Sequence, residues 1–366
     1  MTAILEAALR EHRDLLWGVC YRMLGSPADA DDALQATFEK ALTHPPSDTT
    51  LPLKPWLVRV AVNQCRDELR KEETRKSAFW LPGPLETPAD DPRFMGYEAP
   101  DARYSRMESV SLAFMVALHT LTPLQRAVLI LREVLDLSIA ETSEALEISA
   151  SNVKMALHRA RAALAKGPIG PQLHDRASEE RVLQALLVHL ATHNIPALTQ
   201  LLASDVRLCG DADPDQIAAH RVIVGRDKLL MFQFKTERDG GRIALRLLNG
   251  KPALVAELPG KRAPSSGRMI GEPAPGAPQQ RSLPQHAVLW IELDAGGSVV
   301  ALHVQTSRRK LRHIAFSALG APTLRQLSAA MWAAWRTPQH GAWRRAAAAA
   351  AAAGLIAAWK GWRGSL

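Results

Sequence analysis

Residues 137–166 read LSIAETSEALEISASNVKMALHRARAALAK and predict a helix-turn-helix. Ser138, with Glu141 three residues later, is typical of a capping box at the start of a short helix. Ser149 is expected to cap a second helix after the turn at residues 146–148. The apolar positions of this second helix recur at helical spacing and are expected to face a core: Val153, Leu157, Ala160 and Leu164.

The charge of this stretch changes sign at the turn. Three glutamates precede the turn, whereas four Lys or Arg and no acid occur from Ile148 to His174. A recognition helix needs this asymmetry, because an acid facing the groove would repel phosphate. An amphipathic hairpin with a merely solvated basic face is the alternative. The side chains that point away from the apolar face are the candidate DNA contacts: Ser151, Asn152, Lys154, Met155, His158 and Arg159.

The segment before the helix-turn-helix, Ala117–Leu135, is amphipathic and interrupted at Thr122-Pro123. Thr122 is expected to cap a helix that has Pro123 at its first position. The apolar residues of this helix are expected to pack over the helix-turn-helix: Val128, Leu129, Leu131 and Leu135.

Residues 4–76 are predicted to be helical throughout. One amphipathic helix is expected to end near Gly25, a second to run over about Pro27–Leu42 after the cap Ser26, and a third from near Lys54 through Arg75. Residues 77–108 are rich in Pro, Gly and Asp and are expected to form an exposed linker.

The composition of the 366 residues favours two or three domains with hydrophobic cores. The net charge of +8 comes from the C-terminal tail, because ten Lys or Arg and no acid follow Asp294. The three cysteines show no metal-ligand spacing and indicate buried thiols in a reducing compartment. We find no secretory signal, and the alanine-rich run Ala346–Trp359 is too short for a confident membrane span. A cytoplasmic protein without cofactor or metal is expected.

After a boundary at residues 167–171, the pattern changes to helices over Glu179–Ala203 followed by short strands. Asn249-Gly250 and residues 295–297 are typical of tight hairpin turns, which predicts an antiparallel sheet. A Pro- and Gly-rich loop, Pro259–Pro284, interrupts it. The strands are expected at Val206–Leu208, His220–Val224, Ile243–Leu248, Ala253–Leu258, Ala287–Leu293 and Val299–Gln305.

Residues 1–166 resemble the extracytoplasmic-function sigma factors, the smallest group of the sigma-70 family. Ser26–Phe38, SPADADDALQATF, is similar to region 2.2 of that family, and Pro55–Asn63 with Asp67 and Arg70 is similar to regions 2.3 and 2.4. Leu121–Arg126 and the helix-turn-helix are similar to regions 4.1 and 4.2.

The resemblance implies that region 2.2 docks on core RNA polymerase, that regions 2.3 and 2.4 melt and recognise the −10 promoter element, and that region 4.2 reads the −35 element. The implied polymerase contacts are Asp29, Asp32, Leu34, Gln35, Phe38 and Glu39, although Asp29 can equally favour the helix dipole alone. The implied −10 contacts are Trp56, Arg59, Asn63, Arg66 and Arg70. Trp56 can instead be core, and the charges near Arg70 can be a salt-bridged solvent face.

Residues 178–316 resemble a SnoaL-like cone, which some of these sigma factors carry as a regulatory extension. Residues 249–253 (NGKPA) and 310–313 (KLRH) are similar to motifs of that subgroup of sigma factors, and so are residues 80–84 (WLPGP) in the linker. The implied partner of this extension is the sigma part of the same chain, held at high effective concentration by the tether. Carboxylates suited to proton abstraction in related enzymes are interpreted as solvated loop groups, and so is a nearby histidine: Asp205, Asp211, Asp213 and His220.

The sequence thus predicts a multidomain chain with two all-α units followed by an α+β cone and a basic Ala/Trp/Arg-rich tail. The expected parts are residues 1–78 (region 2), 79–108 (linker), 109–166 (region 4), 178–316 (SnoaL-like) and 317–366 (tail). The predicted function is that of a sigma factor, not an enzyme. A stand-alone helix-turn-helix regulator with a ligand-sensing or isomerase-like C-terminal domain is the alternative. Membrane or nucleic-acid contact of the tail is left unassigned.

Overall fold

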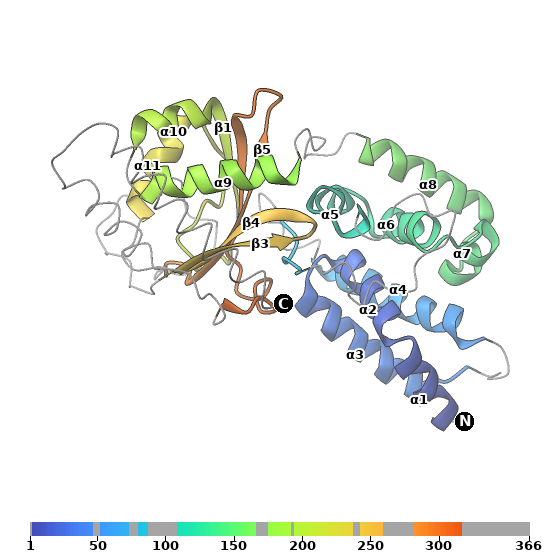
Figure 1. Ribbon diagram of the computed structural model, residues 1–366. Helices are drawn as coiled ribbons and strands as arrows, with labels where there is room; N and C mark the ends of the chain where they lie inside the picture. Colours follow the sequence, from blue (N-terminus) through green and yellow to red (C-terminus); the bar gives the residue numbers. More distant parts are fainter. Residues whose placement is uncertain are drawn as a thin grey trace, which may run out of the picture.

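The computed structural model describes residues 2–46, 52–72, 80–86, 108–165, 175–191, 194–236, 242–258 and 282–316. The predicted tail and most of the predicted loop Pro259–Pro284 lie outside these residues. Two helical units lie beside each other, and a sheet domain lies next to both (Figure 1). The expected order of two all-α units followed by an α+β domain is confirmed.

The N-terminal unit consists of four helices: α1 (Thr2–Glu11), α2 (Arg13–Leu24), α3 (Pro27–Thr43) and α4 (Leu53–Glu72). The single helix expected before Gly25 is divided at His12, although hydrogen bonds continue across the break. Gly25 ends α2 with a φ of 73°, a left-handed conformation that favours glycine. The Ser26 side chain accepts a hydrogen bond from the Asp29 amide at 3.4 Å, so the predicted cap of α3 is confirmed.

The second unit contains the predicted helix-turn-helix. Its elements are a 3₁₀ turn (Glu108–Val110), α5 (Leu112–His119), α6 (Pro123–Leu129), a π-helix (Ile130–Val134), α7 (Ile139–Leu146) and α8 (Ala150–Leu164). A capping box forms at Ser138, as the sequence predicts, and the predicted cap Thr122 also forms one, with Gln125. The hydrogen bonds from Ser138 lower the pKa of the Glu141 carboxyl, which stabilises its charged form at the α7 N-terminus.

The two helical units share one hydrophobic core, which contains fully buried residues of both, such as Leu57 and Leu129. Polar contacts also join the units: Arg126 Nη1 donates to the Met23 carbonyl at 2.5 Å, and Arg22 Nη2 donates to Ser109 Oγ at 2.7 Å. Burying the apolar faces of both units in one core stabilises this compact arrangement. The sequence did not predict this contact between the two units.

The third unit is a six-stranded sheet with strand order β2-β1-β6-β5-β4-β3. Its elements are α9 (Arg176–Ala191), α10 (Ile195–Leu201), β1 (Leu202–Asp211), β2 (Ile223–Val224), α11 (Arg226–Thr236), β3 (Arg242–Leu248), β4 (Lys251–Glu257), β5 (His286–Leu293) and β6 (Val299–Gln305).

The sheet differs from the sequence prediction in three respects. Strand β1 pairs with β6 in parallel, so the sheet is mixed rather than antiparallel. Residues 202 and 203 belong to β1 and not to a helix, and the strand expected at His220–Val224 shrinks to two residues, followed by the unpredicted helix α11. The hairpin at Asn249-Gly250 is confirmed, with positive φ at both residues. Local turn signals identify hairpins, but a parallel pairing between distant strands has no such signal.

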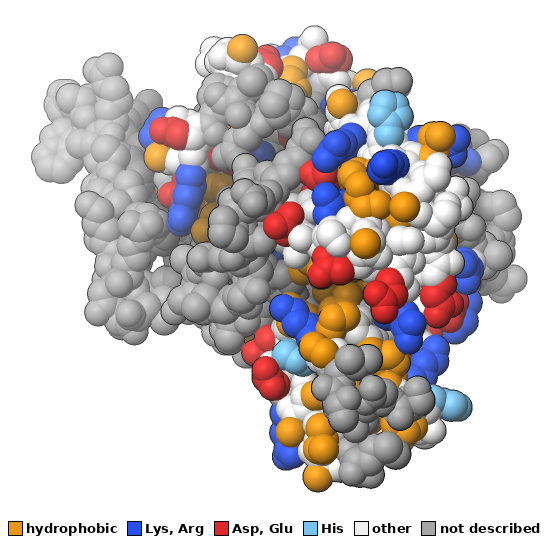
Figure 2. Space-filling view, turned by 90° about the vertical axis from the view of Figure 1, so that its right-hand side faces the viewer, with side chains coloured by type: hydrophobic (Ala, Val, Ile, Leu, Met, Phe, Trp, Pro, Cys, Tyr) orange, Lys and Arg blue, Asp and Glu red, His pale blue; other side chains and the backbone are white. Residues whose placement is uncertain are grey.

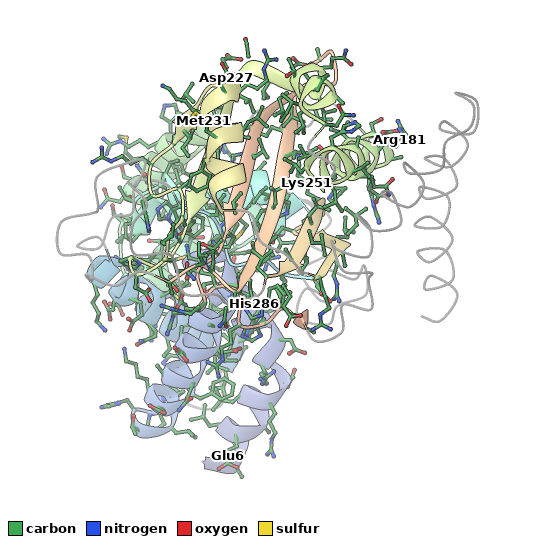
Figure 3. The ribbon with its side chains drawn as sticks, turned by 90° about the vertical axis from the view of Figure 1, so that its left-hand side faces the viewer. Glu6, Arg181, Asp227, Met231, Lys251 and His286 are labelled. Atoms are coloured by element: carbon green, nitrogen blue, oxygen red, sulfur yellow. The ribbon has the colours of Figure 1, made fainter. Side chains whose placement is uncertain are left out.

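The two faces of the sheet bury different partners. Leu254 packs in a core with the helices α9, α10 and α11, and its neighbour Val255 packs in a core with Leu81 and Leu112. Successive strand residues point to opposite faces, so the second core lies on the face away from these helices. Figure 3 shows α11, marked by Asp227 and Met231, lying across the strands, with α9 near Arg181 beside it. Leu81 of the linker and helix α5 of the second unit therefore pack on this second face of the sheet.

Candidate nucleic-acid and polymerase interfaces

Helix α8 presents all six candidate −35 contacts to solvent. Ser149 caps the helix by accepting from the Asn152 amide at 3.2 Å, and Glu147 forms the turn with a φ of 54°. Figure 2, which faces this side of the molecule, shows Lys and Arg gathered above a band of Asp and Glu. The buried side chains of α8 are Val153, Ala156, Leu157 and Ala160, and its exposed candidates are Ser151, Asn152, Lys154, Met155, His158 and Arg159.

The candidate −10 contacts on α4 are half-buried, except Arg70, which is exposed. Arg59 forms an ion pair with Glu147 of the helix-turn-helix at 3.5 Å. Arg66 donates to Asn63 Oδ1 at 3.2 Å, and Arg70 pairs with Asp67 at 3.0 Å. Trp56 is half-buried and packs against the shared core, as its alternative interpretation predicts. The −10 and −35 candidates therefore lie on units that face each other through α4 and α7.

The polymerase candidates on α3 fall into three groups, of which the third consists of Asp29 and Asp32. Leu34 is buried in the shared core and Phe38 is half-buried against it, so Leu34 is not accessible to a partner in this conformation. Gln35 donates to the neighbouring Glu39 at 2.9 Å, and both side chains are exposed. The core needs apolar side chains at these spacings, which is why Leu34 turns inward.

Two of the three acidic candidates of α3, Asp29 and Asp32, are occupied by the C-terminal domain. Arg309 donates to Asp29 Oδ1 and to Asp32 Oδ2, the latter at 2.7 Å. His313 lies 3.0 Å from Asp31, whose carboxylate also accepts from the Trp17 indole. These contacts were missed at the sequence level, because nothing in the basic run after Asp294 indicates which acids it faces.

Residues 80–86, here called the linker strip, are inserted between the helical units and the sheet. Residues 81–85 are buried, so the prediction of an exposed linker is wrong for this part of residues 79–108. The Gly83 amide donates to the Gly25 carbonyl at 2.7 Å, and the Leu81 amide donates to Asp211 Oδ2 at 2.7 Å. Buried backbone groups need such partners, and here both neighbours supply them.

Asp211 anchors the linker strip from the sheet. Its carboxylate also accepts from Lys310 Nζ at 2.6 Å and from Gln305 Nε2 at 3.2 Å. Asp211 is only 5% exposed, so its interpretation as a solvated loop acid is wrong. Asp213 pairs with Arg308, His220 contacts the Gln216 carbonyl, and Asp205 is exposed. The structure does not gather these groups into one site.

Trp80 connects four segments at one indole. Its ring stacks on His119 of α5 at a centroid distance of 4.1 Å, and Lys310 Nζ lies 4.5 Å from its centroid. A Cβ at Gly25 would lie 2.4 Å from Trp80, so only glycine allows this close packing. Burial, followed by the charges of Arg126 and Lys310, lowers the pKa of His119 to about 3, which keeps its ring neutral.

Asn249, in the β3–β4 hairpin, joins all three units. Its Oδ1 accepts from the Leu85 amide at 3.0 Å, and its Nδ2 donates to Tyr21 Oη at 2.7 Å and to the Val110 carbonyl at 2.9 Å. Its backbone pairs with Leu85 and with Leu112. The sequence identified Asn249 as a turn residue, but its side-chain partners lie far away in the chain.

Two negative findings concern the described residues only. No helix among them is long and apolar enough to cross a membrane. Nor does any group of three His, Cys, Asp or Glu there come close enough together to hold a metal ion. The three cysteines are buried and free, as predicted, and burial raises the pKa of Cys65 well above its usual range.

Known proteins share this arrangement. Family models for sigma-70 region 2 and sigma-70 region 4 match residues 8–75 and 111–164. The ECF RNA polymerase sigma factor SigJ of Mycobacterium tuberculosis is 31% identical over 264 residues, covering 69% of this chain and 80% of SigJ. SigG of the same species is 31% identical over 227 residues, covering 55% and 59% of the two chains. The chain therefore belongs to the extracytoplasmic-function RNA polymerase sigma factors.

The fold of the whole chain also has a solved counterpart. The crystal structure of M. tuberculosis SigJ superimposes with a TM-score of 0.54 at 24% identity, covering 81% of this chain and 95% of that chain. This likeness extends beyond the helical units into the α+β domain, which confirms the SnoaL-like fold of the C-terminal domain. Because the chain belongs to this family, it is a sigma factor and not the stand-alone helix-turn-helix regulator that the sequence left as the alternative.

Proposed function

We propose that this sigma factor reads the −35 element with the exposed face of α8 and captures the −10 strand with α4. The carboxylates Asp29 and Asp32 on α3 are proposed to bind core RNA polymerase. The exposure of all six candidate side chains on the capped helix α8 is the observation that carries the DNA-binding role. Their mixture of cationic, amide and apolar groups suits phosphate and base edges in the major groove.

We further propose that the C-terminal domain holds a closed, inactive conformation. Arg309 neutralises Asp29 and Asp32, the acids proposed to bind the polymerase, and Glu147 neutralises Arg59 on the proposed −10 surface. A partner that needs these groups has to displace the intramolecular pairs first. The shared core also prevents the two helical units from separating to reach both promoter elements.

The competition at α3 can be measured with a matched pair of variants. Arg309 pairs with α3, whereas its neighbour Arg308 pairs with Asp213 and Asp215 of its own domain. Arg309→Ala and Arg308→Ala therefore remove the same charge from adjacent exposed positions. Exposed pairs contribute about 0.2–1 kcal/mol each, so loss of the two pairs of Arg309 in Arg309→Ala should tighten binding to core polymerase by about two- to thirtyfold.

The experiment combines polymerase binding with runoff transcription. Full-length wild-type protein, Arg309→Ala and Arg308→Ala are titrated with core RNA polymerase, and initiation is measured on one promoter with intact −10 and −35 elements. Tighter binding and earlier initiation for Arg309→Ala alone support the closed-state proposal. Equal behaviour of both variants contradicts it, and absence of initiation by the wild type and both variants alike contradicts the sigma role of these surfaces.

A further inference from the structure

A charged pair behind α8 has no role in the function proposed so far. Arg161 near the C-terminal end of α8 donates through Nε to Glu133 Oε1 at 3.1 Å, and its Nη2 contacts the same oxygen. The Glu133 side chain is 4% exposed and that of Arg161 is 46% exposed. A buried carboxylate thus holds a half-exposed guanidinium on the recognition helix.

The backbone places Glu133 under α8 by an irregular turn. Residues Ile130–Val134 form a π-helix, in which the Leu135 amide donates to the Ile130 carbonyl at 3.0 Å, five residues back. Such a turn inserts one extra residue and shifts the side chains that follow, and it is often found at functional sites. Here the carboxylate of Glu133, within the π-helix, is directed at α8 rather than at solvent.

Arg161 lies where a free side chain could contact DNA, so its pairing with Glu133 affects the DNA-facing surface of α8. Arg161 follows Lys154 by seven residues, so the two lie on nearly the same side of α8, about two turns apart. A free arginine at this place would extend the cationic stripe of the exposed face and reach for phosphate. The pairing with Glu133 holds it toward the α6 side of the helix instead.

We propose that Glu133 is a positioning residue for promoter recognition: it fixes the rotation of α8 about its axis and keeps Arg161 away from the DNA backbone. Base reading is then left to the exposed side chains nearer the N-terminus of α8, such as Asn152 and Met155. This proposal rests on the proposed reading of the −35 element by α8.

The proposal predicts two opposite effects when the charge of Glu133 is removed. Glu133→Gln keeps the side-chain shape but removes the negative charge, so Arg161 is held only by weaker, neutral hydrogen bonds and can turn toward the DNA. The freed guanidinium adds about one phosphate contact, so the slope of log affinity against log salt should steepen by about 0.9. A loosened α8 should at the same time discriminate about tenfold less between an intact and a scrambled −35 element, because a bidentate base contact is weakened.

The test uses the full chain assembled with core RNA polymerase. Binding to duplex promoters with an intact or scrambled −35 element is measured across about 50–200 mM salt. The control Glu133→Gln/Arg161→Gln contains no freed cation and no unpaired buried charge. This double variant should have the salt slope of the wild type but discriminate less between the intact and the scrambled −35 element. It therefore separates the effect of losing the Glu133 restraint on α8 from the effect of a freed Arg161 charge, even if the single variant folds poorly.

The outcomes are distinct. The proposal is supported if Glu133→Gln has a steeper salt slope, the double variant returns to the wild-type slope, and both variants discriminate less between the two promoters. Wild-type discrimination in the double variant, or a steeper slope that persists in it, overturns the proposal while the −35 role stands. A wild-type holoenzyme that binds both promoters equally well contradicts the −35 role itself.

Discussion

The substitution Asn249→Gly isolates the side chain that joins the three units. Asn249 has a φ of 52° and is fully buried, and glycine adopts this conformation without strain. The hairpin backbone and its bonds to Leu85 and Leu112 can therefore remain. Only the contacts of the side-chain amide with Leu85, Tyr21 and Val110 are lost.

The magnitude follows from the groups left without partners. The Leu85 amide and the Val110 carbonyl lose a buried hydrogen bond each, whereas Tyr21 Oη still donates to the Gly83 carbonyl at 3.1 Å. Each buried, unpaired polar group costs about 1–3 kcal/mol, so the closed conformation should lose about 3 kcal/mol. This loss shifts the ratio of closed to open molecules toward the open form by about 100-fold.

Hydrogen exchange of the linker strip measures this shift. The amides of Leu81 and Gly83 donate to Asp211 and Gly25, which the substitution does not touch. If the junction opens as one unit, both amides should exchange about 100-fold faster in Asn249→Gly. Asn194→Gly, which removes only the cap of α10, is the matched control and should leave them unchanged. Faster exchange at Leu85 alone would refute a cooperative junction.

Three further perturbations test the same closed conformation. The pKa of His119 is lowered to about 3, so neutral His119 stabilises the closed conformation fully above about pH 6.5, and this stabilisation is lost as the pH falls. The fraction of open molecules should increase by less than tenfold at pH 5.5, because solvent screens the exposed part of the ring. His119→Gln should abolish this pH dependence. Gly25→Ala should expel Trp80, seen as a shift of tryptophan emission to longer wavelength; an unchanged emission spectrum would contradict the packing. Leu129→Ala should cost about 2–5 kcal/mol in chemical denaturation and loosen both helical units together, since they share one core; a loss confined to one unit would contradict this.

Much of the fold could be predicted because its signals are local. The caps at Ser26, Thr122, Ser138 and Ser149 act within one helical turn, and all form as predicted. The apolar stripe of α8 and the Asn249-Gly250 hairpin are equally local, since helical period and turn chemistry are read over a few residues. The exposed residues of α8 could be predicted because they lie opposite its apolar, buried residues.

The errors concern contacts between distant segments. The linker strip was expected in solvent because its composition is that of a loop, yet Asp211 and Asn249 satisfy its buried amides. Leu34 was expected at a partner surface, but the shared core needs it. Neither composition nor periodicity contains the identity of a partner more than 100 residues away.

The sequence by itself determined the two helical units, the helix-turn-helix and the α+β class of the third domain, because capping, periodicity and turn propensity are properties of short segments. Only the tertiary structure decided that the units close on one another, that Arg309 faces Asp29 and Asp32, and that Glu133 restrains Arg161. Those pairings depend on how complete surfaces fit together, and that fit is a property of the folded chain as a whole.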